Sequence, residues 1–241
     1  MNNHLNELAI VLTGTIIPNT TNQLQHCDPI IRKSEYLTAI KFYSQFVPVY
    51  FLENSTYSLL EDEDFQCLSN VFIKKFAPST SPEKGRGFQE FEMIDHWLNT
   101  EIIAPAKILK ITGRYLYENI QDILAECRSN LAASLLINQY RLSGFTESAI
   151  FCVTTAYYQQ QISGLYKECD DRTGWFIEKA LHRRLQSVDA ETCQRFKHSL
   201  VCTGIEGFSG QQMRRDWRDR VNRNVATISY MLDKKYLWLK M

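Results

Sequence analysis

Residues 106–120 read AKILKITGRYLYENI, a stretch that opens as a buried strand and changes character within a few residues. Lys110 interrupts its apolar positions, and Gly113 and Arg114 follow before a helical pattern begins. Two permanent cations and a glycine at the end of a strand favour an anionic ligand, because lysine and arginine donate charged hydrogen bonds to phosphate and glycine allows close backbone approach. The alternative is that Lys110 and Arg114 pair with acidic side chains at the edge of the sheet.

The same order of apolar strand, polar break and helix recurs through the first half of the chain. Apolar runs predict earlier strands at residues 8–12, 47–53 and 70–76. Apolar residues at helical spacing predict helices over residues 29–46, beyond Gly87, and from Ile120 onward. Strands that alternate with helices predict an α/β fold with a mostly parallel sheet and helices on both faces. Ligands bind such sheets beyond the carboxyl ends of the strands.

The second half of the chain is less regular. SLLINQYRL (134–142) and SAIFCVTTAYYQQQI (148–162) predict two longer antiparallel strands close to the site. DDRTGWFIEKALHRRL (170–185) predicts a helix that is entered through Asp170 and Asp171. Apolar residues at helical spacing after Met213 predict a C-terminal amphipathic helix over 213–241, so we expect one domain over 1–212 followed by this helical segment.

Charge is balanced over the whole chain, with 27 basic and 27 acidic residues, which does not favour nucleic acid as a partner. The segment 213–241 holds eight basic and three acidic residues, and this basic face could contact an anionic membrane surface. Seven cysteines without a Cys-x-x-Cys pair, and no secretory signal, predict a cytoplasmic protein. No apolar stretch approaches the ~20 residues of a membrane span.

Two further loops carry groups that suit a nucleotide. EKGRGFQE (83–90) feeds a helix N-terminus, whose free N–H groups attract phosphate, and Lys84 and Arg86 add full charges; a solvated loop is the alternative. FLENS (51–55) ends in Glu53 and Asn54, which could accept hydrogen bonds from a ribose hydroxyl or a base edge. An Asx-type turn that caps the strand is the alternative there.

Carboxylates near the predicted helix at 170–185 are the candidates for catalysis. Asp170, Asp171 or Glu178 could act as general base to an acceptor hydroxyl, although whichever aspartate caps the helix would have only a structural role. EDED (61–64) precedes a strand, and we interpret it as a solvated loop. The five histidines show neither the i, i+4 pair nor the Cys-His spacing of zinc ligands, so no metal site is predicted.

The order of these motifs resembles that of a bacterial surface-polysaccharide glycosyltransferase of capsule or lipopolysaccharide synthesis, with a GT-A-like, Rossmann-type fold. The motifs that carry the resemblance are TGT, ENS, KGRGFQE, KITGRY, DDRTGWFIEKAL and GIEGFSG. The resemblance implies that the nucleoside is held by Thr13, Gly14, Thr15, Glu53 and Asn54. It further implies that the rest of the donor lies along Lys84, Gly85, Gly87, Thr112 and Gly113.

The chain departs from the GT-A pattern after the fourth predicted strand. GT-A enzymes usually carry an Asp-x-Asp metal motif there, whereas this chain has Lys110-Ile111-Thr112-Gly113-Arg114. A divalent metal is therefore doubtful, and preorganised cations can stabilise the departing phosphate in its place. We expect Lys110 and Arg114 to serve the diphosphate, and Asp171 or Glu178 to deprotonate the acceptor.

The resemblance implies a nucleotide-sugar donor, with a UDP-sugar as the leading expectation, and no other required cofactor. The implied acceptor is a saccharide or a lipid-linked saccharide, with peripheral contact at the inner membrane through the basic C-terminal helix. Two alternatives remain open at this stage. One is a non-catalytic nucleic-acid-binding protein that uses the arginine-rich tail, and the other is a sulfotransferase-like enzyme with an adenosine phosphate donor.

Overall fold

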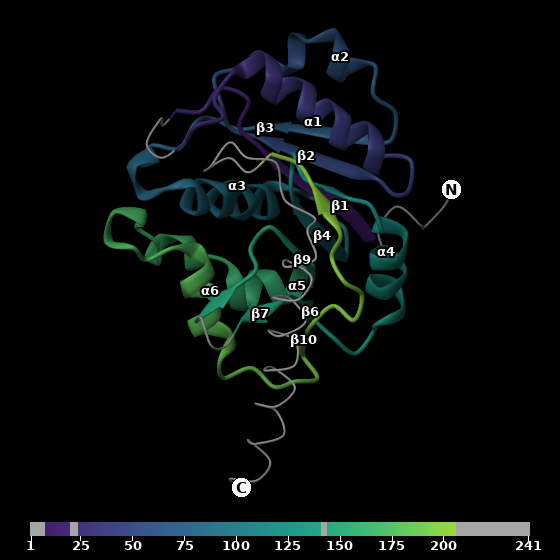
Figure 1. The fold of residues 1–241 in the computed structure, drawn as a ribbon, viewed down its shortest axis with the longest axis vertical. Coiled ribbons are helices and arrows are strands. Elements are labelled where there is room, and N and C mark those ends of the chain that lie inside the picture. Colours follow the sequence, from purple (N-terminus) through teal and green to yellow (C-terminus); the bar gives the residue numbers. More distant parts are fainter. Residues whose placement is uncertain (1–7, 20–23, 141–143, 206–241) are drawn as a thin grey trace, which may run out of the picture.

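The computed structural model describes residues 8–19, 24–140 and 144–205, which fold around one seven-stranded sheet (Figure 1). In spatial order the strands are β10 (Cys193–Gln194), β6 (Leu135–Leu136), β9 (Ile150–Thr154), β4 (Lys107–Thr112), β1 (Leu8–Gly14), β2 (Val49–Glu53) and β3 (Val71–Lys75). β9 runs antiparallel to β4 and β6, and the other neighbouring pairs are parallel. The sheet is therefore mixed and mostly parallel, as the sequence predicts.

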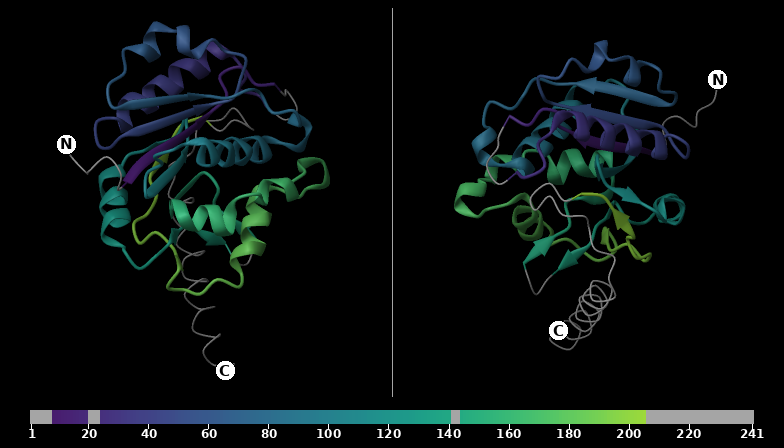
Figure 2. Two further views of the ribbon diagram at one scale, coloured as in Figure 1. Left: turned by 180° about the vertical axis from the view of Figure 1, so that it is seen from behind. Right: turned by 45° about the horizontal axis from the view of Figure 1, so that its top comes forward.

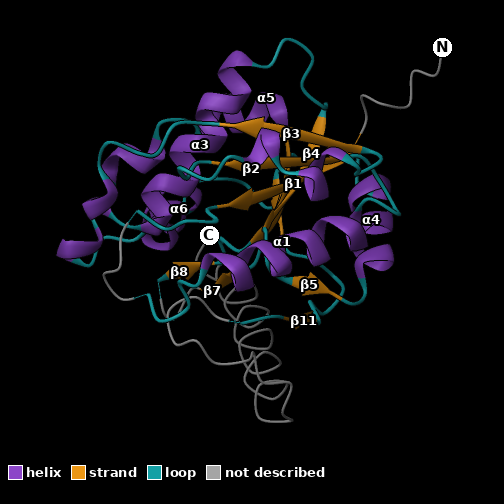
Figure 3. Ribbon diagram, turned by 90° about the horizontal axis from the view of Figure 1, so that it is seen from above, coloured by secondary structure: helices purple, strands orange, loops and turns teal. Residues whose placement is uncertain are grey.

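Helices cover both faces of the sheet, as the view along its edge shows (Figure 3). The longer ones are α1 (Pro29–Tyr43), α3 (Arg86–Thr100), α4 (Ile120–Ser129) and α6 (Ile177–Leu185). One core joins α1 and α4 to one face, with Ile10 and Leu12 of β1 inside it. The other joins α3 and α6 to the opposite face, where Ala9 and Val11 lie. This alternation along a fully buried strand follows from the two-residue period of β structure.

Short elements connect these parts. They are η2 (Leu59–Glu61), α2 (Glu63–Gln66), η3 (Pro82–Lys84), α5 (Thr155–Tyr157), η5 (Tyr158–Ile162), η6 (Leu165–Glu168) and η7 (Asp171–Thr173). Two small ladders pair β5 (Leu116–Tyr117) with β11 (Cys202–Thr203) and β7 (Gln139–Tyr140) with β8 (Phe145–Thr146). Both views in Figure 2 place the amino-terminal segments, in purple and blue, on one side of α3 and the green segments on the other.

Helix α1 shows how the local sequence sets an element's bounds. The Asp28 carboxylate accepts the Ile30 N–H at 2.8 Å, and Pro29 occupies the first helical position, which needs no donor. The helix ends at Tyr43 rather than at Phe46, because the Phe46 N–H donates to the Tyr43 carbonyl at 3.0 Å and tightens the chain into a turn.

Two expectations for the second half are wrong. The stretch 148–162 is a strand only as far as Thr154, whose hydroxyl accepts the Tyr157 N–H and begins the helical segments α5 and η5. The stretch 134–142 gives the two short strands β6 and β7 instead of one long strand.

The helix expected from Asp170 begins only at Ile177. Asp170 and Trp175 exchange backbone hydrogen bonds of 3.0 and 3.2 Å across a tight turn, in which Gly174 adopts a φ of 72°. Glycine tolerates this left-handed conformation, which ends the helical turn η7. The start of the helix was placed wrongly because the sequence pattern does not reveal this turn.

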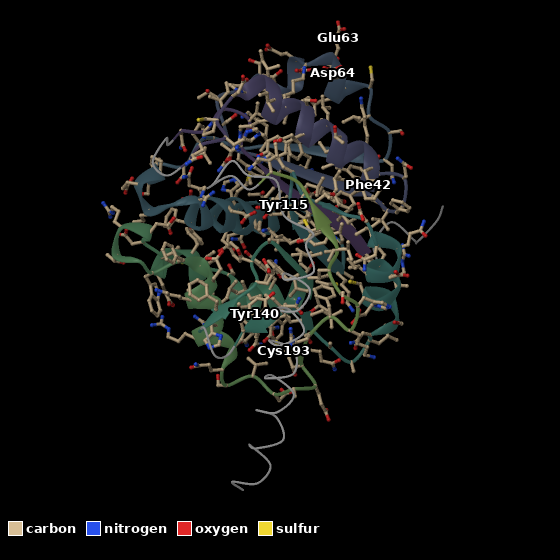
Figure 4. All side chains as sticks on the ribbon, viewed as in Figure 1. Phe42, Glu63, Asp64, Tyr115, Tyr140 and Cys193 are labelled. Atoms are coloured by element: carbon tan, nitrogen blue, oxygen red, sulfur yellow. The ribbon has the colours of Figure 1, made fainter. Side chains whose placement is uncertain are left out.

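The acidic run 61–64 lies at the surface, where Glu63 and Asp64 point outward (Figure 4). It is not a plain loop, because Asp62 caps α2 by accepting the Asp64 N–H at 3.0 Å. Lys33 pairs with Asp62 and Asp64 at 2.6 and 2.7 Å. The expected C-terminal helix 213–241, and the boundary that precedes it, lie outside the described residues. Within the described ranges, no helix combines the length and the apolar character that crossing a bilayer requires.

Candidate functional site

A cleft of about 720 Å³ opens beyond the carboxyl ends of β1 and β4, next to the amino end of α3. It is the place that the sheet topology predicts for a ligand. Of the residues singled out from the sequence, the cleft is lined by Thr13, Gly14, Thr15, Gly87, Thr112, Arg114, Asp171 and Glu178. It is not lined by Glu53, Asn54, Lys84, Gly85, Lys110 or Gly113.

Lys110 lies beneath the cleft, fully buried, and its ammonium group meets three oxygens. Its Nζ lies 2.7 Å from Glu90 Oε1 of α3, donates to the Ser148 carbonyl at 2.7 Å and contacts Thr112 Oγ1 at 3.1 Å. Lys110 is thus paired with an acidic side chain, as in the alternative drawn from the sequence, although the acid comes from helix α3 and not from the edge of the sheet. The direct role of Lys110 at a diphosphate stays a prediction.

Arg114 is also paired, although it lines the cleft. Its Nη1 donates to Glu35 Oε2 at 3.0 Å, and the same oxygen lies 2.9 Å from Nε2 of His26. A guanidinium group has five N–H donors, so this single ion pair leaves Arg114 the capacity to hold a phosphate as well. Gly113 allows two backbone segments to approach closely, since a Cβ at that position would lie 2.5 Å from the Thr13 carbonyl oxygen.

A second arginine, Arg32 of α1, fastens the loop after β1 to this helix. Its Nε and Nη2 donate to the Thr15 carbonyl at 2.9 and 2.5 Å, and Nη2 also meets the Tyr36 hydroxyl at 3.0 Å. Burial, together with the nearby Arg114, lowers the pKa of Arg32. These contacts hold the floor of the cleft beside Thr15 in one conformation.

Glu53 and Asn54 form hydrogen bonds with the loop after β1. Glu53, which is fully buried, accepts the Ile16 and Ser55 N–H groups on Oε1, each at 3.0 Å, and pairs with Lys75. Asn54 Oδ1 accepts the Thr15 hydroxyl at 2.6 Å. The alternative of a structural turn after β2 matches these contacts, and the expected contact with a nucleoside stays a prediction.

The amino end of α3 receives a carboxylate from the protein itself. Gly85 precedes the helix with a φ of 109°, and a Cβ there would lie 1.9 Å from Asp171 Oδ2. Arg86 is exposed at this end and lines the cleft, whereas Lys84 lies over the Phe88 ring at 4.9 Å. Asp171 therefore lies where the sequence pattern predicts phosphate, and Arg86 is the cation of this loop that faces the cleft.

Asp171 and Glu178 form an acidic pair that lines the cleft, and Asp171 lies next to Arg86 at the amino end of α3. Burial, and then the neighbouring Glu178, raise the pKa of the Asp171 carboxyl, while the charge and backbone N–H of Arg86 act in the opposite direction. Glu178 Oε1 accepts the Ser148 hydroxyl at 2.5 Å. Asp170 takes the capping role by accepting the Arg172 N–H at 3.0 Å, so Asp171 is left for the cleft.

The residues of the cleft do not suit a divalent metal. Across the described ranges, no three His, Cys, Asp or Glu side chains come together as metal ligands. The strand end where the GT-A pattern has its acidic motif carries Thr112 and Arg114 instead. We therefore derive no chemical step through a metal, and metal independence stays a prediction.

Three residues that line the cleft carry no prediction from the sequence, namely Arg32, Glu90 and Ser148. A signal existed for two of them. Arg32 and Tyr36 are four residues apart on α1, and Arg86 and Glu90 are four apart on α3, so each pair shares one helix face. A charged residue on the face that packs against the sheet indicates a polar site at that point. Ser148 had no such signal.

A second hollow, of about 500 Å³, lies at the edge strand β3. Its lining is mostly apolar, and the lysines there, Lys74 and Lys75, pair with Glu101 and Glu53. It does not combine cations and carboxylates in the manner of the main cleft.

No protein-family model matches the chain, and no curated protein sequence does. Among solved structures, the fold is similar to that of the glycosyltransferase GlyE of Streptococcus pneumoniae TIGR4, with 10% identity, a TM-score of 0.50 and 80% of this chain covered. The aligned part spans 45% of GlyE. Mouse xyloside xylosyltransferase 1 aligns at 12% identity and a TM-score of 0.43, over 79% of this chain and 84% of that one. At such identity the likeness establishes the fold alone, and the described chain has a mixed α/β fold similar to that of a glycosyltransferase.

Proposed function

We propose that the protein is a glycosyltransferase that binds a nucleotide-activated sugar in the cleft beyond β1 and β4. The observation that carries the proposal is that cations and carboxylates line this one cleft together. Arg86 and Arg114 line it, and so does the Asp171–Glu178 pair. Transfer of a sugar from a diphosphate needs cations at the leaving group and a carboxylate at the acceptor. The fold, which is similar to that of GlyE, adds support.

Arg86 and Arg114 are the groups that we assign to the diphosphate. Negative charge grows on the phosphate as the glycosidic bond breaks, and a cation already in place stabilises that charge without reorganising. Arg114 is held by Glu35, while the side chain of Arg86 is exposed at the amino end of α3, where Asp171 accepts the backbone N–H. Loss of one such group costs ~3 kcal/mol, or on the order of 100-fold in rate.

Asp171 or Glu178 would remove the proton of the acceptor hydroxyl. A general base works best when its pKa lies nearer to the working pH, and the pKa of Asp171 is raised by burial and by Glu178. The reacting sugar would stand beside this acidic pair, with oxocarbenium character at its anomeric carbon. The nucleoside would then lie toward Thr15, on the floor that Arg32 holds.

The finer assignments follow from the resemblance rather than from the cleft. They are a UDP-sugar donor, a saccharide or lipid-linked acceptor in bacterial surface-polysaccharide synthesis, and contact of the basic segment 213–241 with the inner membrane. Each basic residue close to an anionic surface contributes ~1 kcal/mol. We therefore expect salt-sensitive binding to phosphatidylserine vesicles that is lost when Arg214, Arg215 and Arg218 are replaced by alanine. Equal binding by the triple variant would contradict the membrane contact.

A thermal-shift panel tests the function. UDP, GDP, CMP and adenosine phosphates are each added with and without manganese, and binding raises Tm by an amount that grows with the logarithm of the ligand concentration divided by Kd. We expect one nucleoside diphosphate to stabilise the wild type, and Arg86→Ala to weaken that effect by about tenfold or more, as for a charge-assisted hydrogen bond. Arg128→Ala is the matched control, because Arg128 is exposed on α4 outside the cleft.

The panel also separates the competing function. A response confined to adenosine phosphates would favour the sulfotransferase-like alternative. A response to none of the nucleotides would contradict the proposal.

A further inference from the structure

Glu90 carries a heavily anchored carboxylate that lines the cleft. Three donors converge on its Oε1 atom: Lys110 Nζ at 2.7 Å, Thr112 Oγ1 at 3.3 Å, and the Thr13 hydroxyl. Thr13 and Thr112 are register partners in β1 and β4, so their side chains lie side by side beneath α3. Every donor to Glu90 from the described ranges is on Oε1. Because Glu90 also lines the cleft, with its side chain 19% exposed, Oε2 is the oxygen that it offers to a ligand.

Lys110 is fully committed to this arrangement. An ammonium group has three N–H donors, and Glu90, the Ser148 carbonyl and Thr112 Oγ1 account for three contacts. Its Nζ also lies 5.9 Å from the ring centroids of Phe91 and Phe151, which stack on each other. Lys110 therefore fixes the carboxylate above it, and in this arrangement its three donors face oxygens of the protein.

The anchored carboxylate stands near the acidic pair. Lys110 connects Glu90 to the Ser148 carbonyl, and the hydroxyl of the same Ser148 connects to Glu178. Glu90 is thus joined by a short chain of hydrogen bonds to the pair that we assign to the acceptor. A ligand group beside Glu90 belongs to the reacting end of the donor, and the phosphates belong to the arginines.

We propose that Glu90 recognises the transferred sugar by accepting hydrogen bonds from its ring hydroxyls on Oε2, and that Lys110 is the residue that positions Glu90 for this contact. The inference rests on the proposed function and deepens it. An ionised carboxylate only accepts hydrogen bonds, which suits hydroxyl donors and repels phosphate. With Oε1 already held, the carboxylate loses little further freedom on binding, which strengthens its contribution.

The test compares each nucleoside diphosphate with its own sugar conjugates, for example UDP with UDP-glucose, UDP-galactose and UDP-N-acetylglucosamine, and GDP with GDP-mannose. Calorimetric Kd values give the ratio of conjugate to free diphosphate for the wild type, for Glu90→Gln, and for Glu90→Gln combined with Lys110→Met. The double variant removes both charges, so it does not leave an unpaired ammonium group in the core. Glu92→Gln, on the same helix but outside the cleft, is the control.

The expected result has two parts. Both Glu90 variants bind the free diphosphate as the wild type does, and their Kd ratio for the preferred conjugate rises by roughly 10- to 100-fold, the worth of a hydrogen bond to a charged group. Lys110→Met alone shifts the ratio in the same direction, whereas Glu92→Gln leaves it unchanged.

Other outcomes overturn the inference in distinguishable ways. If the Glu90 variants weaken free diphosphate and conjugate equally, Glu90 contacts the ribose or acts only through the fold, and the sugar assignment is wrong while the proposed function stands. If the ratio does not change although both variants fold, the Glu90–Lys110 pair is structural only. If the wild type binds no nucleotide at all, the proposed function fails and this inference fails with it.

Discussion

Replacing Lys110 by methionine tests the most unusual feature of the structure, a lysine without solvent exposure beneath a cleft. Methionine keeps an unbranched chain of similar length and can rest against the rings of Phe91 and Phe151. The substitution removes the ammonium group and leaves the carboxylate of Glu90 and the carbonyl of Ser148 without their cation. Breaking a buried pair in this way costs about 3–5 kcal/mol.

The loss is measurable as a change in Tm. For a domain of 150–250 residues each kcal/mol moves Tm by about 2–4 °C, so we expect a fall of roughly 6–20 °C by calorimetry. Lys74→Met is the matched control, since Lys74 pairs with Glu101 at 2.6 Å with its side chain 34% exposed, and exposed pairs contribute ~0–1 kcal/mol. Adding Glu90→Gln to Lys110→Met should restore part of the loss. The reasoning is refuted if Lys110→Met costs no more than Lys74→Met.

Three further predictions concern single contacts. Because the pKa of Asp171 is raised in the folded protein, the folded state binds this proton more tightly than the unfolded state does. The carboxyl therefore stabilises the fold at a pH below its pKa in the unfolded chain, and this stabilisation is lost as the pH rises through its pKa in the folded protein. Asp171→Asn should therefore raise Tm at neutral pH, and the rise should shrink as the pH is lowered. Asp170→Asn should lower Tm at neutral pH, because Arg172 lowers the pKa of the Asp170 carboxyl, and this fall should also shrink at low pH. A change in Tm that does not vary with pH would count against both predictions. Gly85→Ala should lower Tm by the equivalent of ~1–3 kcal/mol, because the new Cβ would meet Asp171 and the backbone φ is positive. Gly164→Ala should cost less, because its φ is 81° but a Cβ there would meet no neighbouring atom. Equal losses of stability in the two variants would show that the contact with Asp171 is unimportant. Asp28→Ala should cost ~1 kcal/mol in chemical denaturation through loss of the α1 cap, and no change would mean that another group replaces it.

The sequence predicts the first strand of the sheet well because its residues 8–12 are all apolar. Strand β1 is buried along its whole length, and an uninterrupted apolar run is what a central parallel strand requires. The helices on its faces follow from their apolar spacing, and the cap at Asp28 is readable as a local signal. The position of the cleft can then be predicted from the strand ends alone, because ligands bind beyond the carboxyl ends of such strands.

The predictions from sequence fail where contacts between residues far apart in the chain determine the structure. Nothing near Lys110 in the sequence indicates that it forms an ion pair with Glu90, which is 20 residues away and on a helix. Likewise Asp171 reaches the amino end of α3, which the loop pattern alone assigns to phosphate. The start of α6 was misplaced because a backbone bridge between Asp170 and Trp175 competes with helix formation. Charge partners and turns of this kind depend on tertiary packing, so spacing rules do not determine them.

The location of donor binding is tested most directly by amide hydrogen exchange with and without the nucleoside diphosphate that gives the largest thermal shift. Binding in the cleft should slow exchange in segments 13–16, 86–90 and 112–115 together, because these three segments surround it. Amides of the hollow beside β3, in segment 100–103, should exchange at unchanged rates. Protection confined to that edge, or no protection in the three segments while the nucleotide is bound, would contradict a nucleotide-sugar site at the ends of β1 and β4.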